Sequence, residues 1–294
     1  MQRSGFSPEA VDEALIGNVL QAGLGQNPAR QIAMACGVPE LKPAATLNQV
    51  CGSGMYALMQ GLRSILLGEA AVVLAGGTES MSGAPYLLPS LRQGAGYGWA
   101  SALDSVESDG LTDVFDQVHM GITAENIADQ YKISRLQQDA FALDSHLKAL
   151  KAVEEGKFKE EILPVEVKVG KATEVFDSEE IPRREISLEK MAKLPPVFKK
   201  DGTITAGNSC ALCDAASAIV MMSEERAKEM GIEPMAAIRG YATAGVDPKY
   251  MGIGPVEAVP IALKKAGMTL SDIDLIELNE AFAAQYLAVE RELK

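Results

Sequence analysis

Residues 71–75, Ala-Val-Val-Leu-Ala, constrain the fold more than any other run, because every side chain in the run is apolar. A strand with one solvated face alternates apolar and polar side chains, whereas a parallel strand covered on both faces is apolar throughout. The run therefore predicts a buried parallel strand, which we expect to end in a turn at residues 76–80, Gly-Gly-Thr-Glu-Ser. Together with the alternation of strand and helix patterns on both sides of an insertion, this strand indicates a layered α/β fold.

Segments with strand and helix patterns alternate toward both ends of the chain. In the first part we expect a strand within 12–20, a helix over 27–36 with Pro28 at its first position, a strand at 44–47 and a helix over 55–67. In the last part we expect the alternation to resume at 215–222, 236–242 and 255–267, followed by a strand at 274–278 and a helix opening at 279–282.

Between these parts the pattern breaks into stretches rich in Gly, Pro and Ser, with one amphipathic helical run over residues 134–155. An irregular insertion of this length is usually a functional loop domain. We therefore expect a first α/β half at 1–80, an inserted loop domain at 81–200, and a segment 201–294 that ends the first half and begins a second.

Length and charge exclude several classes of protein. The 294 residues suffice for about two domains of ordinary size. The net charge of -13 argues against nucleic-acid and anionic-membrane partners. No stretch is long and apolar enough to span a bilayer, and the amino terminus lacks a signal-peptide core. The 4 cysteines show no disulfide spacing, which indicates the reducing cytoplasm.

Cys51 stands in the turn Asn-Gln-Val-Cys-Gly-Ser-Gly, residues 48–54, between a predicted strand and a predicted helix. The amino end of a helix favours the ionised form of a thiol, which is the nucleophile. Gly52 and Gly54 permit the sharp turn that such a junction requires. We interpret Cys51 as a nucleophile; the alternative is a buried apolar cysteine.

Two predicted strands deliver polar residues to the start of a helix: Asn48 and Cys51 in one half, Asn279 and Glu280 in the other. We interpret this as a trace of internal duplication. Active sites of α/β folds gather at the carboxyl ends of strands, so we expect both motifs to face one cleft.

Seven segments, in order over essentially the whole chain, carry a resemblance to a known family: 26–30 (QNPAR), 48–54 (NQVCGSG), 76–82 (GGTESMS), 109–113 (DGLTD), 119–126 (HMGITAEN), 202–208 (GTITAGN) and 279–282 (NEAF). They resemble thiolases, with the greatest similarity to acetyl-CoA acetyltransferases of the biosynthetic, acetoacetyl-CoA type. The resemblance implies a layered fold of two similar α/β halves, here with an inserted loop domain and incomplete at both termini. It also implies acyl-CoA substrates and no metal or other cofactor.

The resemblance assigns roles to two catalytic residues. Cys51 matches the nucleophile that accepts an acyl group from acyl-CoA, after which a second acetyl-CoA undergoes Claisen condensation, or the reverse cleavage runs. Asn279 matches the asparagine that holds the water of the first oxyanion site. The backbone N–H of Cys51 matches the donor of the second oxyanion site.

The CoA and acyl pocket is assigned by the same resemblance. His119 and Met120 match positions at the pantetheine and acyl end, and Arg183 matches a position near the adenosine phosphates. Neighbouring basic residues are expected to add local positive charge there: Arg184, Lys190 and Lys193. Three further pocket positions belong to the pantetheine loop: Ala206, Cys210 and Leu212. Without the family, His119 is as readily an ordinary hydrogen-bonded histidine, and the basic residues are a solvated charged face.

Two motifs of the family, Gly-His-Pro and Cys-x-Gly, do not occur in this sequence. In the family they carry the histidine that activates the nucleophile and the cysteine that deprotonates the second substrate. General base catalysis contributes typically ~10²–10⁴-fold, so we expect this chain alone to turn over slowly. We expect a truncated or split enzyme, with a separate chain supplying the missing carboxyl-terminal segment as one option.

Three hypotheses follow from these observations. The first is a thiolase-type acyltransferase, working as a homodimer or homotetramer whose contacts include residues 82–99. The second is a catalytically incomplete protein of thiolase descent that binds CoA or another subunit. The third uses the Cys-x-x-Cys of Cys210 and Cys213 for metal or redox chemistry, although no second ligand pair accompanies it. We favour the first.

Overall fold

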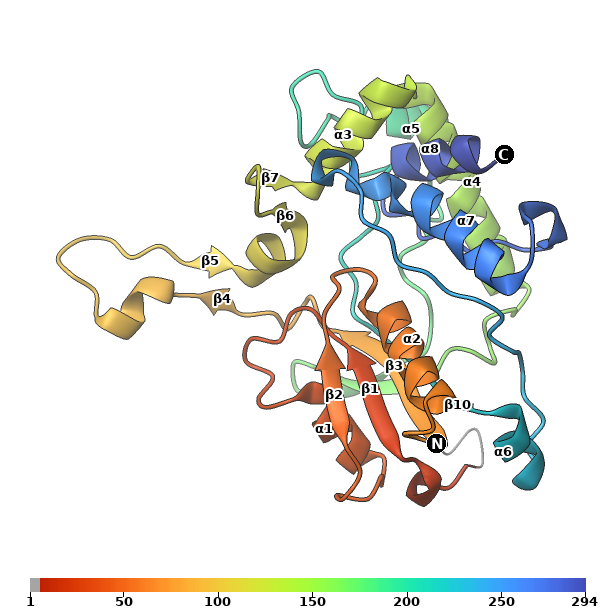
Figure 1. Ribbon diagram of the computed structural model, residues 1–294. Coiled ribbons are helices and arrows are strands. Elements are labelled where there is room, and N and C mark those ends of the chain that lie inside the picture. The colour runs from red at the N-terminus through yellow and green to blue at the C-terminus, as the bar shows by residue number, and fades with distance from the viewer. Residues whose placement is uncertain (1–5) are drawn as a thin grey trace. The chain divides into compact units, whose positions relative to one another are not determined.

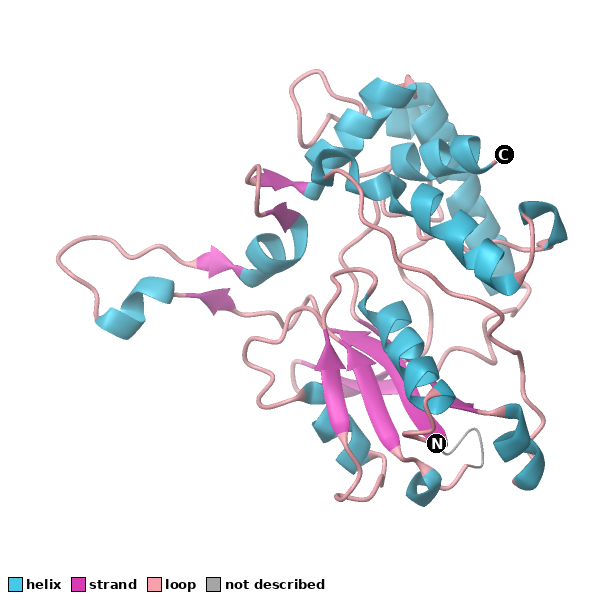
Figure 2. Ribbon diagram, viewed as in Figure 1, coloured by secondary structure: helices cyan, strands magenta, loops and turns pink. Residues whose placement is uncertain are grey.

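The computed structural model describes residues 6–294, and its helices and strands are drawn in Figures 1 and 2. The chain folds as two compact units, each assembled from two stretches of sequence. Unit 1 is the chain up to Gln117 together with Leu212–Tyr241, and unit 2 is Val118–Ala211 together with Ala242–Lys294. The predicted boundaries after residues 80 and 200 stay a prediction.

Unit 1 is built on a four-stranded sheet in the order β10-β3-β1-β2. The strands are β1 (Glu13–Gly17), β2 (Ala44–Leu47), β3 (Val72–Glu79) and β10 (Ala215–Met222). β1 runs parallel to both β2 and β3, whereas β10 pairs antiparallel with β3. The strands predicted within 12–20 and at 44–47 and 71–75 are therefore confirmed, and the alternation expected to resume at 215–222 begins there with strand β10.

The alternate side chains of β3 pack against different helices. Val72 and Leu74 belong to a buried cluster with Ala33 of α1 (Pro28–Ala35), and Val73 and Ala75 to one with Ala57 of α2 (Ser53–Leu66). The sheet thus lies between α1 and α2, as Figures 1 and 2 show. This arrangement confirms the buried parallel strand and the α/β fold class, and it explains why no position of 72–75 is polar; Ala71 is exposed and precedes the strand.

The turn predicted at 76–80 is wrong, because β3 continues through Gly76 and Gly77 to Glu79. A Cβ atom at Gly76 would collide with the backbone oxygen of Ser217 and would lie 2.8 Å from the Cα of Ala218 in β10. Gly76 is therefore a site of close backbone approach within the sheet and not a turn residue.

Unit 1 also contains short elements around the sheet. They are η2 (Pro8–Ala10), β4 (Tyr86–Leu87), η3 (Pro89–Gln93), β5 (Leu103–Asp104), the π-helical turn η4 (Val106–Leu111), β6 (Thr112–Asp113) and α6 (Glu224–Glu229). β4 and β5 form an antiparallel pair at the base of a long arm that leaves the sheet (Figure 1).

Unit 2 is mainly helical. Its elements are β7 (Val118–His119), α3 (Met120–Tyr131), α4 (Arg135–Glu154), β8 (Val165–Val169), β9 (Ala172–Phe176), α5 (Leu188–Ala192), η5 (Pro248–Ile253), α7 (Gly254–Ala266), η6 (Leu270–Asp272) and α8 (Ala283–Leu293). Ala124, Ile127 and Ala128 of α3 pack with Ala284 and Ala288 of α8 in two buried clusters. Helix α3 was not predicted, although its apolar residues follow helical spacing.

Helix α4 confirms the helical run predicted over 134–155. Ser134 accepts a hydrogen bond from the N–H of Gln137, whose side chain in turn accepts one from the N–H of Ser134. This capping box gives hydrogen-bond acceptors to backbone N–H groups that have no partner within the first turn of a helix, and it fixes where α4 begins.

Two other expectations are wrong. Residues 236–242 form no regular element, and residues 274–278 form no strand. Within residues 6–294, no strand pairs with either segment, and a segment without a neighbouring strand does not become part of a sheet. The last helix begins at Ala283, so residues 279–282 precede it and do not form its first turn.

Replacing Gly17 by alanine should destabilise unit 1. A Cβ at Gly17 would collide with the backbone of Ser53 and lie 2.6 Å from the nitrogen of Gly54, so the sheet or the helix has to move. We expect Gly17→Ala to lower the free energy of unfolding by about 1–3 kcal/mol. Urea denaturation measures this, with Gly96→Ala as the control because a Cβ at Gly96 meets open space. Equal stability of the two variants would contradict the close packing of β1 against α2.

Candidate active site

Cys51 lies in a turn that is closed by its own hydrogen bonds. The hydroxyl of Ser53 accepts the N–H of Gln49 at 2.8 Å and donates to the carbonyl of Val50. The N–H of Gly52 donates to the carbonyl of Gln49 at 3.1 Å, and Gly52 is the N-cap of α2. Cys51 is exposed, directly before the amino end of the helix, as the sequence predicted. The alternative of a buried apolar cysteine is therefore wrong.

The backbone of the preceding residue is strained. Val50 has a φ of 48°, in the left-handed region that β-branched residues avoid. A conformation of this kind costs about 1–3 kcal/mol and is kept only where the surrounding structure enforces it. Here the carbonyl of Val50 accepts the hydroxyl of Ser53, and the N–H of Val50 donates to Oδ1 of Asn48 at 2.9 Å, so both sides of the residue are held. Strain next to an exposed thiol is typical of functional sites.

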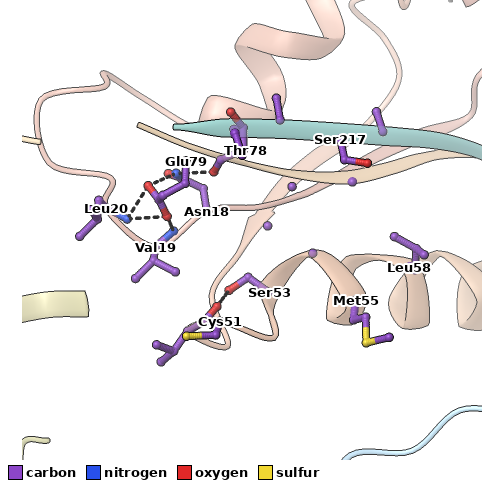
Figure 3. Close-up of a pocket in the computed structure, with 18 of the residues that line it drawn as sticks. Asn18, Val19, Leu20, Cys51, Ser53, Met55, Leu58, Thr78, Glu79 and Ser217 are labelled. Atoms are coloured by element: carbon purple, nitrogen blue, oxygen red, sulfur yellow. Dashed lines mark hydrogen bonds between the residues drawn. The ribbon is translucent and has the colours of Figure 1, made fainter. Parts of the chain in front are cut away.

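A cleft of about 550 Å³ in unit 1 adjoins this turn (Figure 3). The turn and the first half of α2 form one wall, with Cys51, Met55 and Leu58. The ends of β1, β3 and β10, the segments 17–20, 75–79 and 215–219, form the other. Most of the lining is apolar, as in small-molecule sites, where a few polar groups fix the ligand.

Asn18 and Glu79 supply polar groups of the cleft that the sequence analysis missed. The Glu79 carboxylate accepts the Asn18 amide at 3.0 Å and the N–H of Val19 at 2.9 Å, and the Asn18 amide also donates to the carbonyl of Thr78 (Figure 3). Within the described part of the chain, the buried Oδ1 of Asn18 has no hydrogen-bond partner. The sequence shows only the polar character of these residues, because their pairing joins the ends of two separate strands.

His119 lies in unit 2, at the amino end of α3. Its Nδ1 accepts the N–H of Gly121 at 3.0 Å, so His119 is the N-cap of the helix. The ring stacks on Phe198 with centroids 4.6 Å apart, and Phe198 meets Phe282 edge to face. A neutral imidazole that accepts at Nδ1 carries its proton at Nε2 and can donate there. His119 therefore has the structural role of an ordinary hydrogen-bonded histidine, because it caps α3. Met120, the first residue of α3, is half-buried.

The segment after Asn279 lies beside the predicted pantetheine loop, within unit 2. The N–H of Cys210 donates to the carbonyl of Ala281 at 2.9 Å, and the N–H of Ala283 donates to the carbonyl of Asn208 at 3.0 Å. Between them, Ser209 and Phe282 form an antiparallel bridge. The fold thus brings together residues far apart in sequence, and Asn279 itself is exposed just before this contact.

Arg183 is exposed in unit 2, and its backbone N–H donates to Nδ1 of His146 at 3.3 Å. Burial first, and the Arg183 guanidinium second, lower the pKa of His146, while Glu280 acts in the opposite direction. The three basic residues expected to add positive charge each lie near a glutamate: Arg184 near Glu154, Lys190 near Glu185, and Lys193 near Glu189. Exposed pairs of this kind contribute only about 0–1 kcal/mol.

The predicted site residues divide between the two units. Cys51 and Leu212 belong to unit 1, and the other six belong to unit 2: Asn279, His119, Met120, Arg183, Ala206 and Cys210. Leu212 is exposed and does not line the cleft beside Cys51. In residues 6–294, no group of three or more His, Cys, Asp or Glu side chains is placed to hold a metal ion. No helix among these residues is both long and apolar enough to cross a membrane.

The chain matches two family profiles and is similar to known proteins. Residues 1–225 match the profile "Thiolase, N-terminal domain" and residues 232–294 match "Thiolase, C-terminal domain". A probable acetyl-CoA acyltransferase of Staphylococcus aureus (strain COL) is 52% identical over 295 residues, which are 100% of this chain and 75% of that protein. An acetyl-CoA acetyltransferase of Pseudomonas aeruginosa is 51% identical over 294 residues, with the same coverage of 100% and 75%.

Two solved structures are similar along nearly the whole chain. The acetyl-CoA acetyltransferase of Bacillus anthracis has a TM-score of 0.95 at 47% identity, covering 99% of this chain and 74% of that one. Human mitochondrial 3-ketoacyl-CoA thiolase has a TM-score of 0.95 at 46% identity, again covering 99% and 74%.

Removing the hydroxyl of Ser53 should loosen the turn that carries Cys51. Ser53 is buried, so Ser53→Ala leaves the N–H of Gln49 and the carbonyl of Val50 without this partner. We expect a loss of about 1–3 kcal/mol in unfolding free energy, measured by urea denaturation. We also expect slower alkylation of Cys51, followed by mass spectrometry. Ser64→Ala, on the same helix, is the control; equal effects of both substitutions would contradict a special role for Ser53.

Proposed function

The chain belongs to the thiolase family, and from this we propose that it is an acyltransferase in which Cys51 carries the acyl group. The observation that supports this most strongly is the geometry of the Cys51 turn. A strained, internally hydrogen-bonded turn presents an exposed thiol at the amino end of α2, beside an apolar cleft. The thiolate is the attacking form of a cysteine.

In the first half-reaction, the Cys51 thiolate attacks the carbonyl carbon of acetyl-CoA. A C–S bond to Cys51 forms, the C–S bond to CoA breaks, and CoA leaves as a thiolate that takes up a proton. In the second half-reaction, a base takes a methyl proton from another acetyl-CoA, and the resulting carbanion attacks the acetyl group on Cys51. Because the Cys-x-Gly motif does not occur in this sequence, we propose that a separate chain supplies this base. A C–C bond forms, the Cys51 thiolate is released, and the product is acetoacetyl-CoA; thiolysis is the same sequence in reverse.

We propose that Asn279 and the backbone N–H of Cys51 stabilise the negative charge that develops on carbonyl oxygens in these steps. The position of Asn279 supports this role, because the segment that follows it is hydrogen-bonded to residues 208–210. Other unit 2 residues are proposed to bind CoA: His119, Met120, Arg183, Ala206 and Cys210. Leu212, in unit 1, is proposed to contact it as well.

Incubation with acetyl-CoA followed by intact-mass measurement tests the first half-reaction, which leaves a covalent mark on the chain. We expect one acetyl group on the wild type and none on Cys51→Ala. Cys213→Ala removes another exposed cysteine of unit 1 and should still accept one acetyl group. Binding of acetyl-CoA without acetylation of Cys51 would favour the alternative, a CoA-binding protein that does not catalyse the reaction.

We further propose that the protein is a homodimer or homotetramer in the cytoplasm that needs no metal or other cofactor. The arm between β4 and β5 supports self-association, because Tyr97 and Trp99 there are fully exposed and Leu88 and Leu91 partly so. Exposed apolar side chains gathered on one segment often mark an interaction site. None of the 4 cysteines forms a disulfide, which is typical of a reducing compartment.

Light scattering at micromolar concentration tests the proposed association. We expect at least a dimer for the wild type, and a smaller assembly for a Tyr97→Ser, Trp99→Ser double variant. A wild-type monomer would overturn the proposal, whereas a variant that assembles like the wild type would place the contact elsewhere on the surface.

A further inference from the structure

The loop Thr203–Ser209 of unit 2, here called the 203–209 loop, presents one exposed residue. Ala206 is exposed, whereas Ile204, Thr205 and Asn208 are buried and the others are half-buried. A loop in which nearly every residue is at least half-buried is held in one conformation by the residues packed around it. Ala206 at its tip is one of the residues proposed above to contact CoA.

Glu125 of α3 holds the beginning of this loop. Its carboxylate is buried, with 1% of the residue exposed, and it accepts the N–H of Ile204 at 2.8 Å and that of Thr203 at 2.9 Å. The hydroxyl of Thr203 donates to the same carboxylate at 3.1 Å. Hydrogen bonds to an ionised acceptor are about twice as strong as neutral ones, and a buried carboxylate needs them.

Asn208 holds the end of the loop in the same way. Its side-chain oxygen accepts the N–H of Thr205 at 2.8 Å, and its amide donates to Asp139 at 2.9 Å and to the carbonyl of Thr203 at 3.1 Å. Asp139 is itself buried and is fixed by Arg135 of α4 at 2.7 Å. Both ends of the loop are therefore tied to helices, the first to α3 and the second to α4.

The backbone of the same loop reaches the segment that follows Asn279. The carbonyl of Asn208 accepts the N–H of Ala283, and the next residues extend this contact through the Ser209–Phe282 bridge. A shift of the 203–209 loop would therefore move both Ala206 and the segment next to Asn279.

We propose that Glu125, together with the Asn208–Asp139 pair, is a positioning residue that holds the 203–209 loop in the conformation that binds acyl-CoA. The inference rests on the proposed function, because it takes Ala206 and its neighbours to be CoA contacts. Glu125 touches no substrate in this proposal. It acts through the loop, because its carboxylate accepts hydrogen bonds from the N–H groups of Thr203 and Ile204. Within the described residues, no other group accepts these two hydrogen bonds.

Glu125→Gln tests the proposal because it keeps the size of the side chain. In the glutamine, an NH₂ group replaces one of the two carboxylate oxygens. This group donates hydrogen bonds, so it cannot accept the backbone N–H groups that the oxygen accepted. We expect acetyl-CoA to bind about tenfold more weakly, measured by isothermal titration, and the amides of Thr203 and Ile204 to exchange hydrogen about tenfold faster or more. In the acetylation of Cys51, the concentration for half-maximal rate should rise about tenfold while the limiting rate changes less than about twofold.

Two variants of α3 serve as controls. Asp129→Asn removes an exposed carboxylate whose partner is Lys199, outside the loop, and should leave binding unchanged. Ile127→Val removes a buried methyl group away from the loop, so it separates general destabilisation from loss of positioning. If Glu125→Gln does not fold, Asp139→Asn tests the other end of the same network and is expected to weaken binding in the same direction.

Equal acetyl-CoA binding by the wild type and Glu125→Gln would overturn the inference and leave the proposed function intact. An equal loss of binding in Ile127→Val would also overturn it, since the effect would then follow stability alone. A wild type that binds no acetyl-CoA would overturn the proposed function, and the inference with it.

Discussion

The first turn of α2 and the carboxyl end of β1 are in backbone contact, and the position of Cys51 depends on this contact. At Gly17 there is no space for a Cβ, because the backbone of Ser53 and Gly54 occupies it. The turn before the helix has to pass from β2 to this fixed point within a few residues. The strained backbone of Val50 is the consequence, and the hydroxyl of Ser53 stabilises it from within the turn. A rigid sheet thus determines where the thiol lies.

The features that the sequence predicts well are determined by neighbouring residues. The buried strand follows from the successive apolar side chains of residues 72–75, and each of its faces meets a helix. The start of α4 follows from Ser134 and Gln137, which cap each other. The turn at Cys51 follows from glycines next to a helical pattern. In each case the interaction that fixes the structure spans only a few positions along the chain.

The features that the sequence does not predict depend on partners far along the chain. Gly76 and Gly77 resemble a turn unless β10 is known to lie against them. The segment 274–278, Asp-Leu-Ile-Glu-Leu, resembles a strand in sequence, but no strand of the described residues pairs with it. Glu125 is one acidic residue among many, and its burial under the N–H groups of Thr203 and Ile204 cannot be read from its surroundings in sequence. His119 is ambiguous for a different reason, because a helix cap and a ligand-binding histidine look alike in sequence.

The pairing of β10 with β3 has a consequence for how the chain folds during synthesis. β10 joins the sheet only after residues 118–211, the first stretch of unit 2, have been made. Until then the backbone groups on one edge of β3 have no strand to pair with, and the buried cluster of Val73 and Ala75 lacks Met221 of β10. Contacts between segments so far apart form slowly, and an uncovered strand edge invites pairing with other chains. During synthesis the edge of β3 therefore stays unpaired until residues 215–222 have been made, and the exposed thiol of Cys51 lies beside an incomplete sheet for that time.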